Sequence, residues 1–199
     1  MIRKILKFLF INLTSRIWFL KPLYETLNTT STITIKHFFW QKILRINSNI
    51  PWPVHKNSVV TGVKYIEVGF WTAPGASFGN YIFADYHSPI TVGSYTIIAQ
   101  NVCLAGYSHD LYDHRKYISK GGIKIGDYCW IAANSSIMPG VILGNHTIVA
   151  ANTVVTKSFS DGYCVLGGNP AKIIKKLEPE LCVDFNYKYT YKGYKKIKS

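Results

Sequence analysis

A repeat with a period of six residues runs through the second half of the chain. From Ile125 the sequence reads IGDYCW, IAANSS, IMPGVI, LGNHTI, VAANTV and VTKSF, so every unit opens on an aliphatic residue. The second position is small in most units, and the fifth is mostly small or β-branched. Neither an α-helix nor a β-hairpin has this period. The pattern predicts a flat-sided coil that stacks on itself, which is an all-β solenoid.

The same repeat occurs earlier in the chain, with two interruptions. Val68, Val92, Ile98 and Leu104 open units of the same kind. The pattern is irregular between residues 78 and 88, and no unit is found between residues 109 and 122. Because the repeat resumes in a shifted phase, we predict that residues 110–122 leave the coil as a loop. A long loop in a regular solenoid is where function is usually placed.

The two ends of the chain differ from the repeat region. We predict three parts: an N-terminal amphipathic helical appendage (1–50), the solenoid domain (51–177) and a basic Tyr/Lys-rich C-terminal extension (178–199). Near the start, apolar residues recur at three- and four-residue steps with basic residues between them, namely Ile2, Ile5, Leu6, Leu9 and Leu13 with Arg3, Lys4 and Lys7. This is the pattern of a helix lying on an anionic membrane surface. The alternative is that the stripe packs on the end of the coil or on a neighbouring subunit.

Charge and cysteine usage narrow the class of protein. The formal net charge is +13, but Lys and Arg concentrate near the two ends, whereas the repeat region is sparse in them. This distribution argues against a nucleic-acid partner, whose binding face would carry the basic residues within the folded domain. The 4 cysteines form no C-x-x-C pair, and no signal peptide or membrane-spanning stretch is recognisable. We therefore expect a cytoplasmic protein, with a peripheral contact at the inner face of the cell membrane if the N-terminal helix binds lipid.

Five segments resemble the bacterial hexapeptide-repeat acyltransferases, and above all the sugar O-acetyltransferases of polysaccharide biosynthesis. They occur in the family's order and spacing: Gly106-Tyr-Ser-His-Asp110, Ile123 to Ile131, Met138-Pro-Gly140, Val154-Val-Thr-Lys157 and Gly168-Asn-Pro-Ala-Lys172. The resemblance implies a left-handed parallel β-helix with three hexapeptides per coil. It also implies a homotrimer with active sites between subunits, acetyl-CoA along the outside of the coil, and a loop that reaches toward the neighbouring subunit.

His109 is the candidate general base. Acetyl transfer to a hydroxyl needs a proton acceptor within hydrogen-bond reach, and histidine suits this role near neutral pH. His109 stands at the start of the predicted loop and matches the family's catalytic histidine. The simpler alternative is an exposed loop histidine that is hydrogen-bonded to Asp110. We expect a carboxylate to hold the ring, either Asp85 or Asp110, and we expect His87 to contact the sugar; these three are the predicted substrate-binding residues.

The resemblance also places the donor. The pantetheine arm of acetyl-CoA needs partners along a flat edge of the coil, and its phosphates need cations. The matched positions are Ala133 and Ala151 for the arm, Thr156 and Lys157 near the nucleotide, and Lys172 and Lys175 for the phosphates. An ordinary solvated basic face is the alternative for the two last lysines. No histidines have zinc-ligand spacing with a third partner, and the reaction needs no metal.

These features predict an acetyl-CoA-dependent O-acetyltransferase that modifies a sugar hydroxyl during the assembly of a surface polysaccharide, with a sugar or a lipid-linked glycan as acceptor. Two alternatives stay open. One is an N-acyltransferase of an amino sugar, and the other is a non-catalytic solenoid subunit, because a fold alone does not define an activity.

Overall fold

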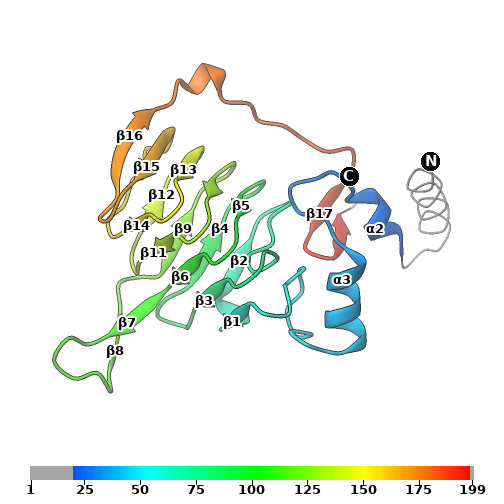
Figure 1. Ribbon diagram of the computed structural model, residues 1–199, viewed down its shortest axis with the longest axis horizontal. Helices are drawn as coiled ribbons and strands as arrows, with labels where there is room; N and C mark the ends of the chain where they lie inside the picture. Colours follow the sequence, from blue (N-terminus) through cyan, green and yellow to red (C-terminus); the bar gives the residue numbers. More distant parts are fainter. Residues whose placement is uncertain (1–19, 198–199) are drawn as a thin grey trace.

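Three parallel β-sheets form the body of the molecule (Figure 1). The computed structural model describes residues 20–197. The first sheet contains β1 (Val59–Thr61), β3 (Tyr81–Phe83), β6 (Cys103–Ala105), β11 (Ser136–Ile137) and β14 (Val154–Val155). The second contains β2 (Ile66–Val68), β4 (Ile90–Val92), β9 (Ile123–Ile125) and β12 (Ile142–Leu143). The third contains β5 (Ile97–Ile98), β10 (Trp130–Ile131), β13 (Thr147–Val149) and β15 (Cys164–Gly167), and is closed by the antiparallel β16 (Lys172–Lys176).

The chain visits the three sheets in turn, as the hexapeptide repeat predicts. After β9 it passes to the third sheet, then to the first, and then back to the second. Ile125 lies opposite Leu143, Ile131 opposite Val149 and Ile137 opposite Val155, so partners are 18 residues apart. Three hexapeptides therefore make one turn, with one short strand on each sheet.

The aliphatic residue that opens each unit points into the coil. All six from Ile125 to Val155 are at most 3% exposed, and Val68, Val92, Ile98 and Leu104 are buried with them. Burial of each such side chain contributes about 1.5–3 kcal/mol. The corners turn through residues with positive φ, among them Asn101, Asn134 and Asn152, which stand at equivalent positions of successive coils. Asparagine tolerates this left-handed conformation better than most residues.

The segments at the two ends of the chain pack together beside the first coil. α2 (Lys21–Glu25), α3 (Ile35–Phe38) and the π-helical turn that continues α3 (Phe39–Ile43) meet the C-terminal hairpin of β17 (Thr190–Lys192) and β18 (Lys195–Ile197). The carboxylate of Glu25 accepts hydrogen bonds from the Tyr191 hydroxyl (2.5 Å) and the Lys196 ammonium (2.8 Å). The apolar stripe predicted at residues 2–13 lies outside the described residues. None of the helices within residues 20–197 is long and apolar enough to cross a membrane.

The C-terminal extension returns along one corner of the coil before it reaches this hairpin (Figure 1). Stacked rings of Tyr95, Tyr128, His146 and Tyr163 line that corner. The extension contacts them through Asp184, which lies 2.8 Å from the His146 ring, and through residues 185 and 186, which accept hydrogen bonds from the hydroxyls of Tyr128 and Tyr95. The extension thereby ties the last coil to the first.

Candidate active site

A β-hairpin projects from the coil at the position where the repeat is interrupted (Figure 1). Its strands are β7 (Tyr107–His109) and the antiparallel β8 (Tyr117–Ser119). The chain leaves the coil at Gly106, where a Cβ atom would lie only 2.5 Å from the Phe83 carbonyl oxygen, so a side chain does not fit. The expected loop 110–122 is thus part of a longer excursion, and His109 lies on a strand of the hairpin instead of on the coil.

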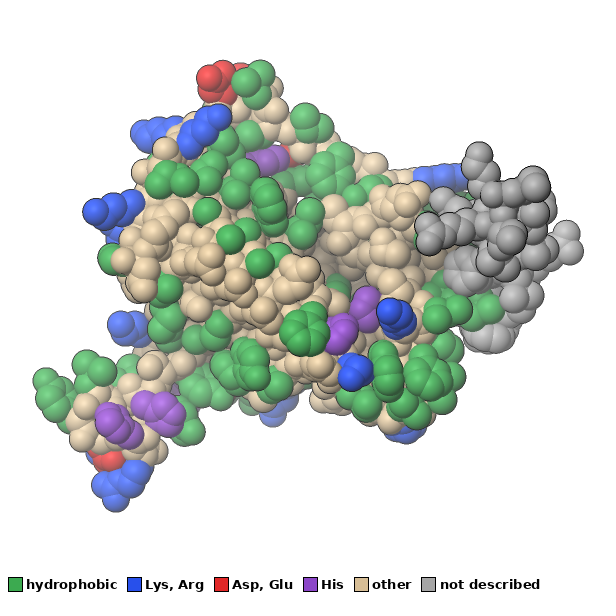
Figure 2. All heavy atoms as spheres, in the orientation of Figure 1, with side chains coloured by type: hydrophobic (Ala, Val, Ile, Leu, Met, Phe, Trp, Pro, Cys, Tyr) green, Lys and Arg blue, Asp and Glu red, His purple; other side chains and the backbone are tan. Residues whose placement is uncertain are grey.

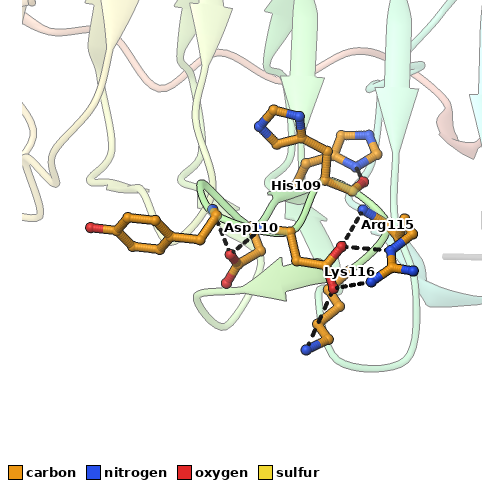
Figure 3. A network of polar contacts seen from close by, with 7 residues as sticks. His109, Asp110, Arg115 and Lys116 are labelled. Carbon is orange, nitrogen blue, oxygen red and sulfur yellow. Dashed lines mark hydrogen bonds and ion pairs between the residues drawn. The ribbon is translucent and has the colours of Figure 1, made fainter.

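A backbone carbonyl fixes the His109 ring. The Nδ1 atom lies 2.6 Å from the carbonyl oxygen of His114, across the hairpin tip (Figure 3). Because a carbonyl only accepts hydrogen bonds, Nδ1 must carry the proton, and Nε2 of the neutral ring then holds a free lone pair. The ring also packs on Tyr117, with 4.6 Å between the centroids. His109 is therefore exposed, oriented and in the tautomer that a base acting through Nε2 requires.

Asp110 shapes the hairpin tip and does not contact the histidine ring. Its Oδ1 atom accepts hydrogen bonds from the backbone N–H groups of Tyr112 (2.7 Å) and Asp113 (2.9 Å), and these bonds lower the pKa of the Asp110 carboxyl. Asp113 in turn pairs with Arg115 at 2.9 Å (Figure 3). This turn places the backbone of residue 114 opposite His109. The carboxylate expected at the ring is replaced, within the described residues, by a carbonyl.

Asp85 and His87 form a tight turn beside the base of the hairpin. The Asp85 carboxylate accepts a hydrogen bond from the His87 backbone N–H at 2.9 Å, and Asp85 pairs with Ser88 through the backbone. The carbonyl of His87 accepts a hydrogen bond from the Ser119 hydroxyl on β8. The turn is therefore fastened to the hairpin through its backbone, and the His87 side chain stays exposed.

A pocket of about 270 Å³ opens on one face of the hairpin. Ser108, His109 and Ile118 line it from the hairpin, and Met138, Pro139 and Thr156 line it from the adjacent corner of the coil. Leu111 and Lys120 complete the wall. The structure thus brings His109 together with Thr156, a residue predicted for the donor. A larger cavity of about 400 Å³ lies against the C-terminal hairpin, between Trp52 and Lys192, and contains none of the predicted site residues.

The opposite face of the hairpin is aromatic. Side chains alternate along a strand, so Tyr107, His109 and Tyr117 lie on one face of the hairpin. Ser108 and Ile118 lie on the other face, which borders the pocket. Tyr107 packs on Tyr117 at 5.3 Å and lies 6.4 Å from Phe83 on β3, where Tyr81 continues the row. The His109 ring therefore lies on the aromatic face, and the residue also borders the pocket.

The other residues predicted for the donor lie further along the coil. Ala133 and Ala151 occupy the same corner of successive coils, where the Ala133 carbonyl accepts a hydrogen bond from the backbone N–H of residue 152. Lys157 follows Thr156 and lies over the Phe159 ring at 5.7 Å. Lys172 and Lys175 are exposed on β16. Within residues 20–197, no cluster of three or more potential metal ligands occurs.

Sequence reasoning missed the residues that complete the site. The His114 carbonyl is a backbone group, which leaves no signal in a sequence. Tyr117 and Ile118 could have been found from the alternation of side chains in β8, had a hairpin been expected there.

The sequence matches a known repeat family and several named relatives. The family described as "Bacterial transferase hexapeptide (six repeats)" matches residues 122–157. The chain is 33% identical to the putative acetyltransferase YvoF of Bacillus subtilis, over 70% of this chain and 76% of the relative. It is 30% identical to WbbJ of Escherichia coli, a putative lipopolysaccharide biosynthesis O-acetyl transferase, over 51% of this chain and 57% of the relative. It thus spans little more than half the length of WbbJ.

Solved structures agree with these matches. A maltose O-acetyltransferase from Clostridium difficile superposes with a TM-score of 0.55 at 26% identity, over 82% of this chain and 91% of that chain. The hexapeptide-repeat acetyltransferase VCA0836 of Vibrio cholerae, crystallised with acetyl coenzyme A, superposes with a TM-score of 0.50 at 27% identity, over 70% of this chain and 78% of that chain. The three-sheeted body therefore has the fold of hexapeptide-repeat acetyltransferases.

Proposed function

The chain belongs to the bacterial hexapeptide-repeat transferases and is an acyltransferase, and from this starting point we propose that it moves an acetyl group from acetyl-CoA to a sugar hydroxyl during surface-polysaccharide assembly. The Nδ1 hydrogen bond that fixes the His109 ring, at a residue that borders the pocket, is the observation that carries the proposal. Names of relatives support the substrate class, because they include a maltose O-acetyltransferase and a putative lipopolysaccharide biosynthesis O-acetyl transferase. VCA0836, crystallised with acetyl coenzyme A, supports the donor.

His109 acts as the general base in this proposal. The acceptor hydroxyl donates a hydrogen bond to Nε2, and its oxygen attacks the thioester carbonyl carbon while Nε2 takes the proton. The carbon–sulfur bond then breaks, and the imidazolium returns the proton to the departing thiolate, so the histidine ends neutral and CoA leaves as a thiol. The His114 carbonyl holds the tautomer throughout and stabilises the imidazolium through the Nδ1 hydrogen bond.

In this proposal the two faces of the hairpin bind different substrates. We assign the pocket to the reactive end of the donor because His109 borders it, and because its apolar walls at Met138 and Ile118 exclude water from the thioester. Thr156, which the resemblance places near the nucleotide, would then contact the reactive end instead. The remaining donor contacts are then Ala133 and Ala151 for the arm, Lys157 near the nucleotide, and Lys172 and Lys175 for the phosphates.

We assign the aromatic face and the adjoining turn to the acceptor. A sugar ring offers an apolar face to aromatic side chains and polar hydroxyls at its edge. Tyr117 provides such a surface next to the His109 ring, and the exposed side chain of His87 lies on the turn that is fastened to β8. Asp85 and Asp110 serve mainly to shape the two turns that border this face.

The assembly that we propose is a homotrimer of left-handed coils. One subunit leaves the outer side of the hairpin open, with Leu111 82% exposed and Tyr112 98% exposed. A neighbouring subunit against the hairpin would cover these side chains and close the site. Sedimentation analysis of the purified protein tests the trimer directly.

Transfer assays test the proposed reaction. The purified protein is incubated with acetyl-CoA and a panel of mono- and oligosaccharides, and the release of CoA thiol is followed with and without each acceptor. We expect acceptor-dependent release and a product that gains one acetyl group, which mild alkali removes. An alkali-stable product would identify an amide and an amino-sugar acceptor, and release that is independent of every sugar would refute the proposal.

A further inference from the structure

The outer face of α3 and the turn that follows it exposes a continuous set of large apolar side chains. Ile35 is 56% exposed, Phe39 42% and Ile43 59%. These residues are four apart, which places them on one side of a helix. Leu44 and Ile46 extend the exposed set. A contiguous apolar surface of this kind on a folded protein usually marks a contact site. We call residues 35–46 the α3 surface.

Basic residues surround the α3 surface, and acidic ones are missing from its sequence neighbourhood. Lys36, Lys42 and Arg45 are exposed between the apolar residues. Residues 26–66 contain no Asp or Glu. Figure 2 shows hydrophobic side chains over α3 bordered by Lys and Arg side chains, at the lower right of the molecule. Within residues 20–197 none of these three side chains forms an ion pair, so the surface combines apolar side chains with unpaired positive charge.

The buried side of the same segment is held firmly, which keeps the apolar side chains outside. Gln41 is fully buried, and its amide nitrogen donates to the carbonyl of Trp52 at 3.1 Å. Its amide oxygen accepts from the backbone N–H of Val54 at 2.9 Å and from the Tyr194 hydroxyl at 2.5 Å. Thr34 caps the start of the helix. The helix cannot rotate to bury Ile35 and Ile43 without breaking these bonds.

We propose that the α3 surface binds an anionic membrane. The apolar side chains enter the boundary between headgroups and acyl chains, and the three basic side chains contact lipid phosphates. An anionic membrane matches both kinds of side chain on this surface. A nucleic acid would bind the basic side chains but would not bury the isoleucines, and a neutral apolar partner would bury the isoleucines but would not neutralise the three cations.

Vesicle flotation of the full-length protein tests the proposal. Vesicles of phosphatidylcholine mixed with phosphatidylglycerol should carry the protein upward, whereas vesicles of phosphatidylcholine alone should carry much less. Replacing Phe39 and Ile43 together by Ser should lower the apparent affinity about tenfold or more. Replacing Lys36, Lys42 and Arg45 by Gln should do the same at low salt and have little effect at high salt.

Matched controls separate membrane binding from the other occupants of this surface. Ile97 and Ile142, on the third and second sheets, are exposed to 39% and 41%, and their replacement by Ser should leave flotation unchanged. Acetyl transfer to a soluble sugar should be unaffected by the α3 variants, so a failure of the proposed reaction would be seen separately. Full flotation of the Phe39 and Ile43 double variant would overturn the proposal. So would a change in its oligomeric mass without loss of flotation, which would identify an interface between copies.

Discussion

Replacement of His109 by Ala should remove most of the acetyltransferase activity and leave the fold intact. His109 is exposed on the hairpin, outside the coil, and its ring is held by the His114 carbonyl and packs on Tyr117, so its loss opens no cavity in the coil. A positioned general base contributes about 100-fold to 10,000-fold to a rate. We therefore expect kcat/KM to fall by about 100-fold or more, which corresponds to at least about 2.7 kcal/mol of transition-state stabilisation.

His114 provides the matched control for this experiment. It lies five residues away on the same hairpin and contributes to the site through its carbonyl, which every amino acid carries. His114→Ala should therefore keep the hydrogen bond to Nδ1, and kcat/KM should stay within about twofold of the wild-type value. Both variants are assayed by acceptor-dependent release of CoA thiol, with circular dichroism and thermal melting to confirm folding. Equal losses in the two variants, or near-normal turnover of His109→Ala, would refute the role assigned to His109.

Three further predictions follow from the contacts around the site and between the chain ends. Asp110→Ala should lower kcat by about tenfold, because the hairpin tip loses the acceptor of two N–H bonds, whereas Asp110→Asn should restore most of the activity. Since those bonds lower the pKa of Asp110, the tip should stay ordered above the ordinary Asp pKa and loosen as the pH falls through the lowered value. The same dependence of kcat on pH in the wild type and in Asp110→Asn would contradict this prediction. Replacing Lys172 and Lys175 together by Ala should raise the KM for acetyl-CoA about three- to tenfold at low salt and leave the acceptor KM unchanged, and an unaltered donor KM would place the phosphates elsewhere. Partial burial of Glu25 raises its pKa, but hydrogen bonds from the C-terminal hairpin outweigh this effect and lower the pKa. These bonds should add about 1–2 kcal/mol to the free energy of unfolding. The added stability should be complete above the ordinary Glu pKa and be lost as the pH falls through the lowered value. Melting of Glu25→Gln against wild type should show a difference at pH 7 that vanishes in acid.

The body of the fold could be predicted because one physical requirement repeats along the chain. Each unit must bury one aliphatic side chain, and Ile131, Ile137 and Val149 do so at the expected positions. The hairpin could not be predicted in the same way. Its strands β7 and β8 pair only with each other, outside the coil, so no repeating burial marks them. The packing of the predicted C-terminal extension was equally hidden, because its contacts with Tyr95 and His146 join residues far apart in the sequence.

The candidate site was predictable where side-chain chemistry defines it and hidden where the backbone does. A histidine at the start of a loop indicates a candidate base in the sequence. In the structure His109 borders a pocket that Thr156 also lines. Its orienting partner was sought among carboxylates, because only side chains can be read from a sequence. In the structure the carboxylates of Asp85 and Asp110 accept hydrogen bonds from backbone N–H groups, and the His114 carbonyl orients the His109 ring.

The use of a carbonyl instead of a carboxylate has a consequence for the proposed chemistry. A carboxylate beside Nδ1 would place a full negative charge next to the ring. The His114 carbonyl fixes the same tautomer and adds only a dipole. The hydrogen bond to Nδ1 therefore depends on the conformation of the hairpin, which must hold the backbone at residue 114 within hydrogen-bond reach of His109. The turn at Asp110 and the pair of Asp113 with Arg115 hold the tip in this geometry, so we expect these charged residues to support the proposed base through the backbone.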